Sequence, residues 1–339
     1  MKFTWRIAAL ATLLLGGLAN AQQPVLTGAG ATFPAPLYHT WAQTSQSQLG
    51  FQTNYQSIGS GAGTNQIINR TVNFGASDAP LSSERLNQNN LMQVPTVTGS
   101  IVLAYNIPGV NNGQLRLTPE VLVAIYQGQI QLWNDPRIVS INPGVTLPRL
   151  PIMPVYRADG SGTTWIFTQY LSRVSAAWRD GIGASTSVRW PVGTGARGNE
   201  GVSATVSRQR GSIGYVESSF AVINNLAMAQ LQNKSGNFVL PTSENVRATA
   251  SAAEFTAENN FVPDLLDQTG ANSWPIVGAT YLLIPTNNPD RASNRRLVQF
   301  IQWCFDNGDG AAERLHYVPL PPQVKQTLLA ALRERLVIE

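Results

Sequence analysis

The chain has 339 residues, of which 43% are hydrophobic and 12% charged, and its formal net charge at pH 7 is +4. It has no basic run, and the positive charge is small, so the composition argues against a nucleic-acid-binding protein. A single cysteine, Cys304, excludes an internal disulfide, and its place in the apolar run at 297–305 predicts a buried structural thiol.

The first 21 residues have the layout of a secretory signal peptide. Lys2 and Arg6 come before and beside an apolar run at 7–18, and an Ala-Asn-Ala tripeptide ends at Ala21. The apolar run is too short to cross a bilayer about 30 Å thick, which disfavours a transmembrane anchor. We therefore predict cleavage after Ala21 and export to a periplasm. Removing 21 of the 339 residues leaves a chain long enough for two domains.

From residue 24 onward, short β-rich runs alternate with amphipathic helical runs. Strands are predicted at 51–58, 72–76, 100–107, 152–156, 211–217 and 278–285, and helices at 36–48, 65–70, 83–89, 163–174 and 248–260. Another helix is predicted to begin after Thr118, because Thr118 can cap it and Pro119 suits its first turn. This alternation is typical of parallel α/β sheets, in which ligands bind at the carboxyl ends of strands.

Two long apolar strands, at 100–107 and 278–285, are similar in pattern and far apart in sequence. They could be crossover strands that join two domains. The first domain would then be discontinuous, at 24–105 plus 282–339, and the second would occupy 106–281. Both could equally be ordinary central strands, and the sequence favours neither arrangement.

Four segments rich in glycine and hydroxyl residues, at 27–33, 59–63, 75–78 and 157–164, each follow a strand-like run and precede a helix-like run. Backbone N–H groups at helix starts bind anions, and small hydroxyls add further donors. The segments together predict a closed cage for a small tetrahedral oxyanion. The candidate hydroxyl donors are Thr32, Ser60, Ser161 and Thr163, each of which could instead cap a helix.

Two charged residues in these segments bear on the ligand. Arg157 could meet two oxygens of an oxyanion in a planar fork, and Asp159 could hold its guanidinium or serve a turn. Asp78 should repel an anion unless the ligand brings a proton for the carboxylate to accept. The alternative is that Asp78 is only a turn residue. Phosphate carries such a proton near neutral pH and sulfate does not. Sites that pair a substrate O–H reject analogues lacking it by roughly 10⁴–10⁵-fold.

The same segments resemble the periplasmic phosphate-binding proteins of Pst-type ABC phosphate importers. The motifs that carry the resemblance, in order, are LTGAGATFPAPLY (26–38), QSIGS (56–60), NFGASDAPLS (73–82), YRADGSGTT (156–164) and GSIGYVE (211–217). The resemblance implies a type II periplasmic binding protein fold, in which two α/β domains are joined by two hinge strands. It also implies one phosphate in the cleft, no cofactor, and delivery to the membrane permease subunits of an ABC transporter. We expect a monomer.

The resemblance further implies a set of phosphate-binding residues, with Asp78 as the acceptor of the phosphate proton and Asp159 holding Arg157. The set is Ala31, Thr32, Phe33, Ser60, Asp78, Arg157, Ser161, Gly162 and Thr163. One departure is Gly61, where the family often has a second serine. If that hydroxyl binds phosphate in relatives, its loss here should have a modest cost.

Three other functions compete with phosphate binding. A secreted phosphatase or esterase could use Ser161 as nucleophile, but the only histidines are His39 and His316, and no G-x-S-x-G elbow or metal-ligand spacing is present. A dinucleotide enzyme is suggested by the G-x-G-x-x-G at 193–198, which follows a β-like run at 188–192. Glu217 lies about as far along the chain as the acidic residue that binds a ribose in such enzymes. Trp190-Pro191 weakens this interpretation, because it would break the preceding strand. Among other oxyanions, Asp78 disfavours sulfate, while arsenate and molybdate stay open.

Overall fold

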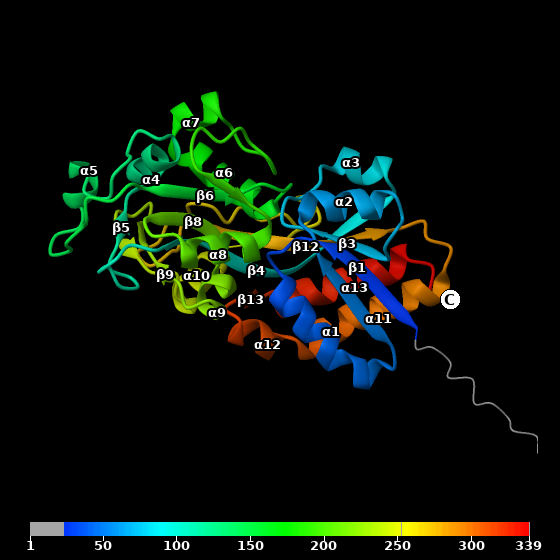
Figure 1. The fold of residues 1–339 in the computed structure, drawn as a ribbon. Helices are drawn as coiled ribbons and strands as arrows, with labels where there is room; N and C mark the ends of the chain where they lie inside the picture. Colours follow the sequence, from blue (N-terminus) through cyan, green and yellow to red (C-terminus); the bar gives the residue numbers. More distant parts are fainter. Residues whose placement is uncertain (1–23, 252, 339) are drawn as a thin grey trace, which may run out of the picture.

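A computed structural model describes residues 24–251 and 253–338 (Figure 1). The predicted signal peptide and its cleavage site lie outside these residues. Two lobes lie side by side, and the long strands β4 (Leu91–Tyr105) and β12 (Val277–Pro285) run through the middle of the molecule between them. Within the described part of the chain, no helix is long and apolar enough to span a bilayer.

The first lobe is built from both ends of the described chain. It contains β1 (Val25–Gly30), α1 (Ala35–Leu49), β2 (Gln52–Ser57), α2 (Ser60–Ile68), β3 (Phe74–Ser77), α3 (Ser83–Gln88), α11 (Arg291–Asn307), α12 (Asp309–Arg314), β13 (Val318–Pro319) and α13 (Pro322–Arg335). Helices α1, α11 and α13 lie together, and Cys304 of α11 is buried as predicted.

The second lobe is formed by the residues between β4 and β12. It contains β5 (Arg116–Leu117), α4 (Pro119–Tyr126), α5 (Pro136–Val139), β6 (Met153–Arg157), α6 (Gly162–Val174), α7 (Ala176–Gly181), β7 (Thr194–Ala196), α8 (Gly198–Arg208), β8 (Ser212–Glu217), α9 (Ser218–Ile223), β9 (Ala227–Met228), β10 (Gln230–Gln232), β11 (Phe238–Val239) and α10 (Ser243–Ala250). Helix α4 begins as predicted, with the Thr118 hydroxyl accepting from the Val121 N–H.

The main sheet has the strand order β2-β1-β3-β12-β4-β8-β6-β7. Pairing is parallel among β1, β2 and β3 and among β6, β7 and β8, as predicted, but β12 and β4 run antiparallel to each other and to their outer neighbours. Residues 91–100 of β4 pair with β12, and residues 101–105 pair with β8. Strand β4 therefore passes from one half of the sheet to the other.

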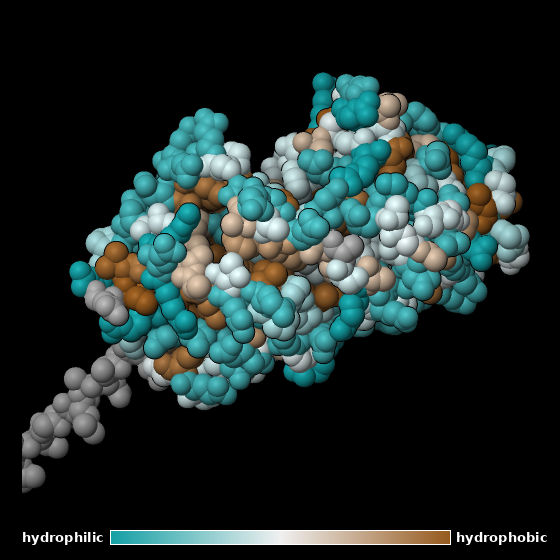
Figure 2. Space-filling view, turned by 180° about the vertical axis from the view of Figure 1, so that it is seen from behind, coloured by the Kyte–Doolittle hydropathy of each residue, from teal (hydrophilic) through white to brown (hydrophobic). Residues whose placement is uncertain are grey.

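Burial explains why neither of these two strands contains a charged residue. Every residue of β4 and β12 is buried, because strands with neighbours on both sides and helices on both faces have no solvent-facing side. By contrast, the face of the molecule in Figure 2 is mostly polar, with small apolar patches and a hollow between the lobes at the edge that carries α3 and α7.

Three secondary-structure predictions are wrong. The helix predicted at 248–260 is α10, which lies at Ser243–Ala250, because the Thr242 hydroxyl caps it earlier. Beyond it, Thr256 and Asn259 hydrogen bond to each other's backbone N–H, an arrangement that competes with a helix. No strand forms at 188–192, and α2 begins at Ser60 rather than at 65.

Candidate functional site

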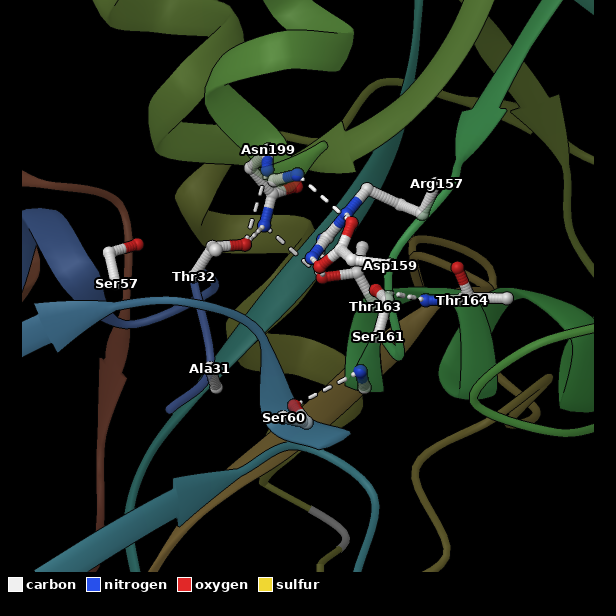
Figure 3. Close-up of polar contacts among 12 residues, drawn as sticks. Ala31, Thr32, Ser57, Ser60, Arg157, Asp159, Ser161, Thr163, Thr164 and Asn199 are labelled. Carbon is white, nitrogen blue, oxygen red and sulfur yellow. Dashed lines mark hydrogen bonds and ion pairs between the residues drawn. The ribbon is translucent and has the colours of Figure 1, made fainter. Parts of the chain in front are cut away.

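The four glycine- and hydroxyl-rich segments meet where the two lobes touch. Strands β1, β3 and β6 end at Gly30, Ser77 and Arg157, and the chain then enters the segments that hold Thr32, Asp78 and Ser161. Figure 3 shows Thr32 and Ser60 on one side, with Ser161, Thr163 and Arg157 facing them from the other.

Hydrogen bonds join the lobes directly at this place. The Ser60 hydroxyl accepts from the Gly162 N–H at 3.0 Å and from the Asp78 N–H at 3.3 Å. The Gly61 N–H donates to the Gly160 carbonyl at 2.9 Å. Since Ser60 and Gly61 belong to the first lobe and the two glycines to the second, the lobes are closed on each other.

Several backbone N–H groups here have no partner among the described residues. Those of Thr32, Phe33 and Thr163 make no hydrogen bond to another described group, and the last belongs to the first turn of α6. The Ala31 N–H is used, because it donates to the Ala76 carbonyl at 2.9 Å. The unpaired N–H groups suit an anion. Ala31 instead fixes the path of the chain.

The hydroxyls divide between capping and other contacts. Ser161 caps α6, since its Oγ accepts from the Thr164 N–H at 3.0 Å. Thr32 and Thr163 instead both accept from Asn199, and Ser60 bonds across the lobe contact. All four side chains are buried. Capping is therefore right for Ser161 and wrong for the other three.

Arg157 forms a buried ion pair with Asp159. Its Nε and Nη2 donate to the two carboxylate oxygens at 2.8 and 2.5 Å, and the two side chains are 1% and 9% exposed. Partial burial acts to raise the pKa of Asp159, but the Arg157 hydrogen bond and charge, with the Gly198 N–H, hold it below its usual value. The guanidinium is thereby fixed with Nη1 beside Thr163, 3.4 Å from its hydroxyl.

Asp78 is a buried carboxyl at the end of β3, 2% exposed. Burial raises its pKa to about 7, even though a hydrogen bond from Thr280, the charge of Arg157 and a hydrogen bond with Ser60 all lower it. Thr280 Oγ1 donates to Asp78 Oδ1 at 2.8 Å. A carboxyl held this close to neutral pH can exchange a proton with a ligand.

Three residues at the site were not predicted from the sequence: Asn199, Tyr215 and Thr280. Tyr215 accepts from the Arg157 N–H at 3.0 Å, and its OH lies 2.7 Å from Thr164 Oγ1. Thr280 comes from β12, far from Asp78 in the sequence, and no local pattern marks it. Asn199 had a usable signal, because it lies in the first turn of a helix after a glycine, as the predicted donors do.

Two grooves reach the edge of the site. One, of about 250 Å³, is lined by α6, the segment at 262–266 and the start of β12, and it includes Asp78. The other, of about 360 Å³, includes Ser60, Gly61 and Arg85. The lining of neither groove includes Arg157 or Thr163, which lie deeper, at the contact of the lobes.

The structure gives little support to the enzyme alternatives. Neither histidine contacts Ser161: His39 is exposed on α1, and His316 lies beside Ser243, 3.1 Å from its hydroxyl. Among the described residues, no cluster of His, Cys, Asp or Glu could hold a metal ion.

The dinucleotide interpretation is wrong in its details. Strand β7 lies inside the 193–198 motif rather than before it. Glu217 is fully buried, which raises its pKa to about 8, and it accepts hydrogen bonds from Ser218, Ser219 and Tyr317. It is therefore not available to a ribose.

Gly61 lies against the opposite lobe, and this predicts the effect of restoring a serine there. A Cβ on Gly61 would lie 3.2 Å from the Gly160 Cα, which is tight but not prohibitive. We expect Gly61→Ser and Gly61→Ala to weaken binding of the site's anion similarly, by about tenfold, because crowding at the lobe contact opposes closure. Titration calorimetry of both variants measures this. Tighter binding by the serine variant than by the alanine variant would instead show that the missing hydroxyl is a ligand.

The comparisons with known proteins agree with one another. Residues 18–307 match the family described as the PBP superfamily domain. The chain is 43% identical to the phosphate-binding protein PstS of Haemophilus influenzae (96% of this chain, 97% of the relative) and 44% identical to that of Pasteurella multocida (96% and 95%). The structure of PfluDING, a high affinity periplasmic phosphate-binding protein bound with phosphate, superposes with a TM-score of 0.72 at 24% identity (91% and 93%). That likeness shows the same fold.

Proposed function

The chain belongs to the PstS phosphate-binding proteins of the PBP superfamily, and on this basis we propose that it captures inorganic phosphate between its lobes for an ABC-type permease. Its family consists of solute-binding proteins. The fold is the type II periplasmic binding protein fold.

One observation carries the proposal: buried donors gather at the contact of the lobes, and the buried carboxyl of Asp78, beside Ser60 and Gly162, can accept a proton there. We assign phosphate oxygens to the N–H groups of Thr32 and Phe33 in the first lobe, and to Arg157 and Thr163 in the second. The rest of the proposed set is Ala31, Ser60, Ser161 and Gly162, which shape the cage or add donors. Asp78 accepts the proton of the bound phosphate, and Asp159 holds the guanidinium of Arg157.

We propose that the lobes open and close about β4 and β12. The predicted domains, 24–105 plus 282–339 and 106–281, divide the chain near the residues where strand pairing changes. In β4 this change lies between Ser100 and Ile101, and β12 begins pairing with β4 at Val277. Each of these strands passes between the lobes as one extended segment, so a small backbone rotation in each would separate the lobes.

The protein works in the periplasm, as a monomer that meets the membrane permease after closure. The structurally similar PfluDING protein is described as periplasmic, which supports this compartment. Cleavage after Ala21 would release the mature chain.

Isothermal titration of the mature chain with phosphate, arsenate, molybdate and sulfate tests this function. We expect one phosphate per chain to bind strongly, and sulfate hardly at all. Arsenate should bind as well, because it carries a proton in the same way as phosphate. A chain that binds no phosphate would contradict the proposal.

The phosphatase alternative has its own test. We expect no Ser161-dependent hydrolysis of an aryl phosphate, because the Ser161 hydroxyl accepts from the Thr164 N–H and neither histidine contacts it. The release of the aryl alcohol is measured for the wild type and for Ser161→Ala. Turnover that disappears in the alanine variant would identify an enzyme.

A further inference from the structure

Asn199 is a fully buried polar side chain at the contact of the lobes, at 0% exposure, and it has no part in the proposed phosphate-binding set. Its backbone N–H and its Nδ2 donate to Thr32 Oγ1 at 3.2 and 2.7 Å. Nδ2 also donates to Thr163 Oγ1 at 3.2 Å. Asn199 therefore joins a hydroxyl of the first lobe to one of the second, as Figure 3 shows.

The orientation of the Asn199 amide is fixed by a third partner. Its Oδ1 accepts from the Glu217 N–H at 3.0 Å. A flipped amide would set its NH₂ group against this N–H and its oxygen against the threonines. The NH₂ group must therefore face Thr32 and Thr163, and both of its hydrogens are used there.

This geometry determines what the two hydroxyls can do. A hydroxyl has two lone pairs and one hydrogen. Both lone pairs of Thr32 Oγ1 are filled by Asn199, and those of Thr163 Oγ1 are filled by Asn199 and by Arg157 Nη1, at 3.4 Å. Each O–H can then only donate.

Closure of the lobes supplies part of this arrangement. Thr32 lies in the first lobe and Asn199 in the second, so the lone pairs of Thr32 are filled only when the lobes meet. The second lone pair of Ser60 is also filled on closure, because its Oγ accepts from the Gly162 N–H across the contact as well as from the Asp78 N–H in its own lobe.

Resting on the proposed phosphate capture, we propose that Asn199 is a specificity-determining positioning residue. By filling lone pairs on Thr32 and Thr163, it makes both hydroxyls obligatory donors once the lobes close. A ligand oxygen that carries hydrogen finds no acceptor at either threonine or at Ser60, which leaves the Asp78 carboxyl as the charged acceptor for the ligand's O–H. The pocket then selects a tetrahedral oxyanion that is protonated at one position only.

Asn199→Asp tests the proposal, because it keeps the side-chain size and replaces the donating NH₂ with an accepting oxygen. The threonine hydroxyls would then donate to the new carboxylate instead of to phosphate. We expect the phosphate Kd, measured by titration calorimetry, to rise by about 100-fold or more. Folding is checked separately by circular dichroism and Tm.

A double-mutant cycle separates positioning from a general structural role, and it also serves if Asn199→Asp does not fold. Asn199→Ala, Thr32→Val and the pair are titrated with phosphate. If Asn199 acts through Thr32, the pair should lose at least about fivefold less affinity than the product of the single losses. A loss equal to that product would overturn the proposal.

Asn142→Asp is the matched control, because Asn142 is also buried and donates through Nδ2 to two groups, the carbonyls of Arg116 and Ile138. It should lower Tm and leave the phosphate Kd of the folded protein within about twofold. If the wild type binds phosphate and Asn199→Asp binds it equally well, this inference fails and the proposed function stands. If the wild type binds none, the proposed function itself fails.

Discussion

Asp78→Asn is expected to remove most of the preference for phosphate over sulfate, which in sites of this kind reaches roughly 10⁴–10⁵-fold. Above the Asp78 pKa of about 7, sulfate would face a buried carboxylate and would have no proton to share with it, at a cost in desolvation and like-charge repulsion. An asparagine is neutral, and if its amide oxygen keeps the hydrogen bond from Thr280 Oγ1, its NH₂ group faces the ligand. Sulfate then gains a donor, while phosphate loses the acceptor for its proton. Calorimetric Kd values for both anions, in the same buffer, give the ratio.

Asp180→Asn is the matched control for this change. Asp180 is exposed and pairs with Arg179, so the substitution makes the same change in net charge at the surface. Its ratio of phosphate to sulfate affinity should equal that of the wild type. If Asp78→Asn keeps the wild-type ratio, Asp78 does not read the proton of the ligand.

Gly162→Ala is expected to hold the lobes apart. Its Cβ would lie 2.5 Å from the Asp78 Cβ and 2.7 Å from the Asp78 nitrogen, closer than non-bonded atoms approach. Neither neighbour is the end of a flexible side chain, so the lobes have to separate. A displacement of about 1 Å can reduce the effect of a set of positioned groups on the order of 100-fold, so we expect the phosphate affinity to fall by at least that factor. Small-angle scattering should also show no compaction when phosphate is added.

The backbone at 162 accepts alanine, since Gly162 is not among the residues with positive φ and begins α6. Gly181→Ala is a suitable control, because a Cβ there has nothing within 4 Å. Normal phosphate binding and compaction by Gly162→Ala would show that the two lobes do not need this close contact.

The site was predictable where its chemistry is local in the sequence. Arg157, Ser161 and Thr163 fall in one segment between a strand and a helix, and Thr32 falls in another segment of the same kind. The sequence alone therefore predicts where their backbones lie. Thr280 was not predicted, since its role depends on its meeting Asp78, which is distant in the sequence. The place of Asn199 after a glycine at a helix start marked it as a possible donor, but its contact with Thr32 could not be predicted.

The fold was predictable in its α/β alternation but not in all its boundaries. The glycines at 59–63 predicted a loop, whereas most of them form the first turn of α2. Gly63 is required there by packing, because a Cβ on it would lie 2.2 Å from the Gly30 Cα of β1. In a single sequence, a glycine that lets a helix pack closely on a strand looks the same as a glycine that forms a turn.

A crystal structure of the mature chain with phosphate bound is the most direct test of the account. It should show one phosphate between the lobes, with one phosphate oxygen about 2.5–2.7 Å from a carboxylate oxygen of Asp78. Arg157 and the N–H groups of Thr32, Phe33 and Thr163 should hold the other oxygens. A phosphate bound elsewhere, or an Asp78 side chain that turns away from it, would contradict the account.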